Sequence, residues 1–242
     1  MKYLGDSYDI HTASRELAFP HHENEIAIAG ALTGKPLARF WIHCDRVLVD
    51  GKKMDETGDG LTIQHLMDMG FSGREIRYWL ISSHYRRPIQ FARAKLVNAG
   101  NSLQRMDSCI SRLHELPEGA SYKDLDQLLY DIRRGFIDAM DDDLNISAAL
   151  ASIFRMIKKI NRLISEEALH QSDANKITDV FKKINTVLNL LDLEEKPLDA
   201  DIQRLLEKRD RARQEQNWKV ADEIRNELIA RGVAIRDRER IS

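Results

Sequence analysis

Apolar residues recur at alternating steps of three and four along four long stretches of the chain, which is the spacing of one face of an α-helix. The stretches are 96–113, 125–140, 146–164 and 177–191, and short polar segments separate them. Four such stripes joined by short loops predict an antiparallel helical bundle, with the Ile, Leu and Met side chains of the stripes in its core.

The first sixty residues have a different pattern, with extended segments around one apolar helix. Residues 8–11 are strand-like, and residues 40–43 and 46–49 are aromatic and β-branched, with a polar turn between them that predicts paired strands. An apolar helix is expected from Pro20 to Leu32, because proline suits a first helical turn. Two strands and a helix do not close a domain alone. The sequence therefore predicts a mainly α protein that begins with a remnant of a larger α/β sheet, either one short hairpin or a strand pair plus a helix.

Composition limits the class of protein. The chain has 242 residues, enough for one large domain or two ordinary ones, and 37 basic against 39 acidic residues give a net charge of −2. This balance offers no bulk electrostatic argument for nucleic acid binding. Cys44 and Cys109 make no disulfide framework, and no signal sequence or apolar run of membrane-spanning length is present. A cytoplasmic protein without a membrane partner is expected.

Side chains that can take part in catalysis or binding are most concentrated in the segment from Phe19 to Glu25. It contains two histidines, two glutamates and an asparagine. On a helix His21 and Glu25 are four residues apart and share one face. A histidine and a carboxylate at this spacing can hold a metal, orient a nucleophile or bind a polar substrate. The alternative is a polar helix start whose side chains pair only with one another.

A second candidate surface lies near the C-terminus, where two helices are expected over 202–213 and 218–231. Arg204, Lys208 and Arg211 fall on one helical face. They predict a row of cationic side chains that contacts the phosphates of a nucleic acid backbone. Acidic residues are interleaved with them, so the alternative is an ordinary solvated face.

Several motifs occur in an order that is typical of one family. They are Asp9-Ile10-His11, Phe19 to Glu25, Trp41-Ile42-His43, Val49 to Met54, Arg77-Tyr78, Ser82 to Arg86, Ala139 to Asn145 and Trp218 to Arg225. With these motifs the chain resembles the C-terminal half of the cysteinyl-tRNA synthetases, a family of class I aminoacyl-tRNA synthetases.

The resemblance implies ATP-dependent ligation of cysteine to tRNA, with ATP and zinc as the family's cofactors. It implies substrate-binding roles for His11, His22 and Trp41. It maps two of the four zinc ligands of the family onto His21 and Glu25. The two cysteine ligands would lie upstream of Met1, and neither Cys44 nor Cys109 falls at a matching position, so the zinc site is expected to be incomplete.

The resemblance also shows where the chain departs from the family. The Lys-Met-Ser-Lys-Ser loop reads Lys53-Met54-Asp55-Glu56-Thr57, so Lys53 is kept as a candidate catalytic residue while Glu56 inverts the charge of the second lysine. A carboxylate there repels the phosphates of ATP that the lysine would stabilise. Residues 12–16 replace the glycine-rich turn, and the His-Ile-Gly-His motif is absent because the chain begins after it.

These departures predict a chain that does not activate cysteine by itself and acts as a tRNA- or protein-binding module, with no cofactor of its own. The alternative is a cysteine–tRNA ligase fragment or subunit that is completed by a missing nucleotide-binding half. Association with a complete synthetase is a further possibility.

The expected domains are four. Residues 1–60 form the end of a class I catalytic domain, and residues 61–115 form a helical connector similar to the stem-contact fold. Residues 116–195 form a DALR-like helical bundle, and residues 196–242 form a helical pair that faces tRNA.

Overall fold

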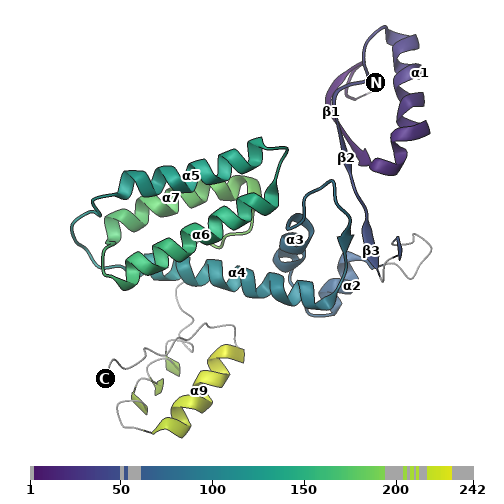
Figure 1. Ribbon diagram of the computed structural model, residues 1–242. Helices are drawn as coiled ribbons and strands as arrows, with labels where there is room; N and C mark the ends of the chain where they lie inside the picture. Colours follow the sequence, from purple (N-terminus) through teal and green to yellow (C-terminus); the bar gives the residue numbers. More distant parts are fainter. Residues whose placement is uncertain are drawn as a thin grey trace. The chain divides into compact units, whose positions relative to one another are not determined.

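The computed structural model describes residues 3–49, 52–53 and 61–193, and near the C-terminus residues 204–205, 208–209, 211–212 and 217–230. The chain forms two compact units. The first combines Met1–Leu103 with Asp126–Lys158, and the second combines Gln104–Leu125 with Lys159–Ser242. Most helices and strands of the two units are labelled in Figure 1.

The chain starts with a β-α-β arrangement. Strand β1 (Tyr8–Ser14) pairs in parallel with β2 (Ala38–Cys44), with Ile10 opposite Phe40 and His11 opposite Trp41. Helix α1 (Glu23–Thr33) connects the two strands, as a parallel pair requires. Gly34 ends α1 in the left-handed region at φ 67°.

Between β1 and α1 the chain passes through two short turns, η1 (Arg15–Leu17) and η2 (Ala18–His22). Phe19 is extended inside η2, with φ −131° and ψ 133°. The prediction that the regular helix starts at Pro20 was therefore wrong by three residues, because this distorted turn precedes Glu23.

The prediction that the two aromatic and β-branched segments pair with each other was also wrong. Strand β2 pairs with β1, whereas β3 (Val47–Val49) lies in a second sheet of order β4-β3-β5. There it pairs antiparallel with β4 (Lys52–Lys53) and in parallel with β5 (Ile89–Gln90). The crossover helix α1 brings β2 beside β1, and this long-range pairing has no counterpart in local sequence.

Helices α2 (Ile63–Asp68) and α3 (Gly73–Ile81) follow, each with the cap that its sequence supplies. The Thr62 hydroxyl accepts a hydrogen bond from the His65 backbone N–H at 3.0 Å, and Ser72 forms a capping box with Glu75. These helices share one apolar cluster with the start of α4, made of Leu66, Phe71, Ile76, Trp79, Leu96 and Ala99.

Four long helices carry the predicted apolar stripes: α4 (Arg93–His114), α5 (Leu125–Asp141), α6 (Ile146–Ser165) and α7 (Gln171–Leu188). Side chains of every stripe are buried, among them Met106, Ile132, Ile160 and Ile177. Helix α9 (Trp218–Ala230) lies near the C-terminus. The predicted fold class, mainly helical with a remnant of an α/β sheet, is confirmed. In the described part of the chain no helix has the length and apolar character needed to span a membrane.

Two polar junctions join distant segments within the units. In the first unit Asp143, in the turn between α5 and α6, accepts hydrogen bonds from the Tyr85 hydroxyl and the Arg86 Nε, both at 2.6 Å. The hydrogen bonds from Arg86 and Tyr85 lower the pKa of Asp143 to about 2. In the second unit the fully buried Asp173 of α7 accepts from the Ser121 hydroxyl and from two backbone N–H groups.

Candidate functional site

The candidate site is built on neighbouring positions of the parallel strand pair. Because His11 and Trp41 are opposite each other in the register, their rings stack, with centroids 4.2 Å apart and planes 20° apart. Tyr8 extends the stack along β1, and its hydroxyl is hydrogen bonded to Nδ1 of His11 at 2.7 Å. This pair of strands therefore presents an aromatic surface with imidazole nitrogen atoms at its edge.

His22, from the distorted turn before α1, covers that surface. Its side chain is only 4% exposed, and its ring lies 5.1 Å from that of Trp41 and 5.2 Å from that of His11. Nδ1 of His22 is hydrogen bonded to Nε2 of His43 at 2.9 Å. Burial lowers the pKa of His22, and the neighbouring His43 lowers it further. His22 is therefore a neutral hydrogen-bonding or metal-binding group rather than a cation.

In the first turn of α1, Glu25 brings a carboxylate to the same place. A ligand atom of each of His11, His22 and Glu25 lies within 4.8 Å of the others, and these three residues are named here the His–Glu cluster. Nε2 of His11 is 3.9 Å from the Glu25 carboxylate. Two imidazoles and a carboxylate suit zinc with an open fourth position, but they lack the thiolates usual in closed structural sites.

His21 is not part of this cluster. Its side chain is exposed, whereas His22 is buried beside Trp41. The sequence paired His21 with Glu25 on an ideal helix, but regular helix begins only at Glu23. Cys44 also lies outside the cluster, since neighbouring strand residues point to opposite faces and His43 faces His22.

The remaining predicted site residues lie in other parts of the chain. The backbone of Lys53 belongs to β4, opposite Leu48. Asp55, Glu56 and Thr57 lie outside the described residues. The segment from Thr12 to Ser14 continues β1 and pairs with β2.

The predicted basic row is helical and faces outward. Arg204, Lys208 and Arg211 are all exposed, whereas Arg209 and Ala212 on the other face are buried at 6% exposure each. The four- and three-residue spacing therefore gives the expected division into an outer and an inner face.

Sequence reasoning missed Tyr8 and His43 as members of the site. The available signal was strand alternation, because Trp41 and His43 are two residues apart and share one face of β2. What the sequence lacked was the parallel register that sets Ala13 opposite His43 and His11 opposite Trp41.

Comparison with protein families gives three matches in consecutive order. Residues 1–101 match the catalytic domain of class I tRNA synthetases of the cysteine type, and residues 135–192 match the DALR domain. Residues 195–241 match the cysteinyl-tRNA ligase anticodon-binding domain.

Curated relatives match along almost the whole chain. Proteins named cysteine–tRNA ligase from Chlamydia felis and Halalkalibacterium halodurans are 42% and 37% identical over 241 residues, 98% of this chain in each case. The chain spans about half of their length, 51% and 52% respectively. A solved ternary complex of LeuRS, tRNA and LeuAMS from Agrobacterium radiobacter is similar in fold, with a TM-score of 0.55, 16% identity, and coverage of 75% of this chain and 26% of that one.

Proposed function

Since the chain belongs to the cysteinyl-tRNA synthetase family and corresponds to its C-terminal half, we propose that it is a tRNA-binding module. The observation that carries this proposal is the match of residues 195–241 to an anticodon-binding domain. The exposed row of Arg204, Lys208 and Arg211 lies within that region and supplies cations for phosphate contacts.

Salt-dependent binding measurements test this proposal. We expect tRNA to bind the full chain, with affinity falling as salt rises and with a slope of about 0.9 or less per phosphate contact. Lys208→Glu together with Arg211→Glu should weaken binding and flatten the salt slope. The matched control is Lys158→Glu with Lys176→Glu, two exposed lysines of α6 and α7. Equal affinities and slopes for both double variants would refute the role of the basic row.

We further propose that the 242 residues do not activate cysteine by themselves. The support is chemical, since Glu56 stands where the family has a lysine that stabilises the phosphates of ATP. Strand β1 also continues through Thr12 to Ser14, where the family has flexible glycines. Cysteine-dependent exchange between ATP and pyrophosphate is the test, and measurable exchange by this chain would contradict the proposal.

A second candidate role, association with a nucleotide-binding half of the family, is favoured by the uncovered strand pair. Parallel sheets are normally covered on both faces. In β1 and β2 one face carries the His11–Trp41 stack, but the other carries Ile10 and Phe40, which lie opposite each other and are 55% and 61% exposed. We propose that this second face packs against further strands or helices of a class I catalytic domain, in the same polypeptide or in another.

Sedimentation with a purified partner tests the association. The N-terminal half of the Chlamydia felis ligase is mixed with this chain, and a stable complex is the expected result. Phe40→Lys should abolish it, whereas Tyr130→Lys should not, because Tyr130 is a comparably exposed aromatic residue of α5 at 58%. Absence of a complex with the unaltered chain, or equal loss with both variants, would contradict the proposal.

A further inference from the structure

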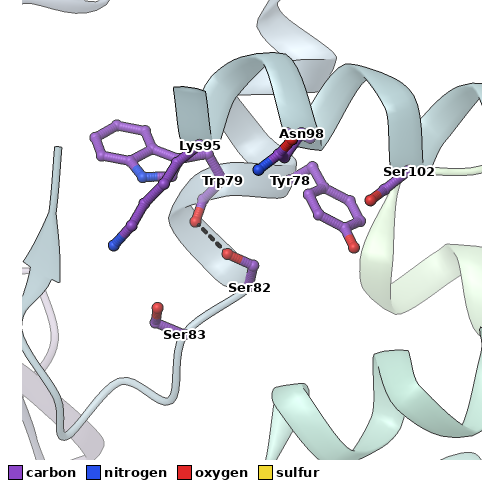
Figure 2. A pocket seen from close by; sticks show the side chains of 8 residues that line it. Tyr78, Trp79, Ser82, Ser83, Lys95, Asn98 and Ser102 are labelled. Carbon is purple, nitrogen blue, oxygen red and sulfur yellow. Dashed lines mark hydrogen bonds between the residues drawn. The ribbon is translucent and has the colours of Figure 1, made fainter. Parts of the chain in front are cut away.

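A pocket of about 220 Å³, with a mixed polar and apolar lining, lies between α3 and the start of α4, away from the His–Glu cluster. Lys95, Asn98 and Ser102 line one wall from α4, where steps of three and four place them on one face. The rest of the lining consists of Ala99 of α4, Tyr78 and Trp79 of α3, and Ser82 and Ser83 of the following loop. In the view of Figure 2, Tyr78, Asn98 and Ser102 lie on one side of the pocket and the Lys95 side chain extends on the other.

The lining carries several hydrogen-bonding groups without a protein partner. Within the described residues, no hydrogen bond or ion pair engages the side chains of Tyr78, Ser83, Lys95, Asn98 or Ser102. Three hydroxyls, an amide and an ammonium group therefore border one small space. Unpaired donors around one small pocket are typical of a site that binds a polar ligand.

Trp79 also borders the pocket, but its indole is buried. Its side chain is 4% exposed, and its Nε1–H has no partner among the described residues. This nitrogen atom has almost no accessible surface, and Trp79 packs in the apolar cluster with Leu96, so a ligand in the pocket does not reach it. By contrast, the Ser82 hydroxyl donates to the Trp79 carbonyl at 2.8 Å, which removes one acceptor from the pocket (Figure 2).

Charge and size specify the ligand. The lining contains the cation of Lys95 and no carboxylate, so it favours an anion. Sites for drug-sized ligands have volumes of about 300–1,000 Å³, and this pocket is smaller. It therefore suits one tetrahedral oxyanion rather than a whole nucleotide.

We propose that this pocket binds a phosphate group, held by Lys95 with the hydroxyl and amide donors around it. The phosphate is either a free ion or a single phosphate of a tRNA backbone. The second source rests on the proposed tRNA-binding function, whereas binding of inorganic phosphate does not depend on it.

The test follows the indole N–H resonances of the three tryptophans, Trp41, Trp79 and Trp218, by NMR of the full chain. They are assigned with Trp41→Phe and Trp218→Phe. Inorganic phosphate is titrated against chloride at constant ionic strength, and the Trp79 resonance alone should shift and saturate. Lys95→Gln should weaken phosphate binding at least about tenfold, because it removes a charge-assisted contact. Lys176→Gln, an exposed lysine of α7, should leave binding unchanged.

A second titration with tRNA distinguishes the two sources. The ligand is a backbone phosphate if tRNA shifts the same Trp79 resonance and competes with phosphate for the pocket. In that case the slope of the logarithm of tRNA affinity against the logarithm of salt concentration should be smaller by about one in Lys95→Gln. If phosphate saturates the pocket but tRNA affinity is the same in Lys95→Gln and Lys176→Gln, the ligand is a free oxyanion. The proposal is overturned if phosphate fails to shift the Trp79 resonance, or shifts it equally in both lysine variants. Unshifted Trp41 and Trp218 resonances in ligand-free Lys95→Gln show that the variant is folded.

Discussion

Replacing Asp173 by alanine should strongly destabilise the second unit of the protein. The Asp173 side chain is fully buried near the start of α7. One carboxyl oxygen accepts from the Ser121 hydroxyl at 2.6 Å, and the other accepts from the backbone N–H groups of Tyr122 at 3.0 Å and His170 at 3.1 Å. Asp173 therefore caps its own helix and also fixes the loop that precedes α5.

The size of the effect follows from the groups that would be left without an acceptor. Alanine at position 173 leaves the N–H groups of Tyr122 and His170 without their acceptor, and each such group costs about 1–3 kcal/mol when buried. The Ser121 hydroxyl can rotate to another acceptor, so it adds little. The expected loss in the free energy of unfolding is about 2–6 kcal/mol. Asp173→Asn keeps one acceptor oxygen and should lose less.

Urea unfolding, followed by circular dichroism at 222 nm, measures the loss, and amide hydrogen exchange at Tyr122 and His170 locates it. The control is Asp179→Ala on the same helix. Asp179 is 68% exposed in its side chain and contacts Lys182 at 3.3 Å, so its loss should cost about 1 kcal/mol or less.

Two results would refute the reasoning. One is equal stability of Asp173→Ala and Asp179→Ala. The other is destabilisation of Asp173→Ala without faster exchange of the Tyr122 and His170 amides, which would show that packing rather than hydrogen bonding holds the loop.

Three further predictions concern titration, thiol reactivity and metal. Since the hydrogen bond from Arg86 holds the pKa of Asp143 at about 2, below its ordinary 3.8, the folded state gains stability at higher pH and loses it as pH falls through this interval. Asp143→Asn should remove that part of the pH dependence of the melting temperature, and an unchanged pH profile would contradict it. Burial raises the pKa of the Cys109 thiol to about 12, so Ellman's reagent should modify the partly exposed Cys44 first and Cys109 only on unfolding; simultaneous reaction would contradict this. Protein purified without added metal should hold less than stoichiometric zinc, because the His–Glu cluster offers three ligands and no thiolate, and one zinc per chain by elemental analysis would refute it.

Helix positions follow from the sequence because their causes are local. The three-and-four spacing from Leu96 to Leu113 predicted the buried face of α4, and Thr62 and Ser72 supply the caps of α2 and α3 from adjacent residues. The exposed face of Arg204, Lys208 and Arg211 also follows from spacing alone. These features depend on residues within one or two turns of each other.

The candidate site depends on contacts that no local pattern contains. His22 rather than His21 is buried beside Trp41, because a distorted turn delays α1 until Glu23. The parallel register of β1 and β2 then sets His11 against Trp41, thirty residues apart in the chain. A shift of one residue in that register would turn every strand side chain to the opposite face.

The buried hydrogen bonds and the phosphate pocket show the same division between local and long-range causes. The sequence places Asp173 in the first turn of α7, but only tertiary structure brings the N–H of Tyr122 to it. It places Lys95 and Ser102 on one helical face, but only the packing of α3 against α4 makes them line one pocket with Tyr78. Local periodicity determines which side chains share a face of a helix or strand. Strand pairing and helix packing between distant segments determine which residues that face contacts.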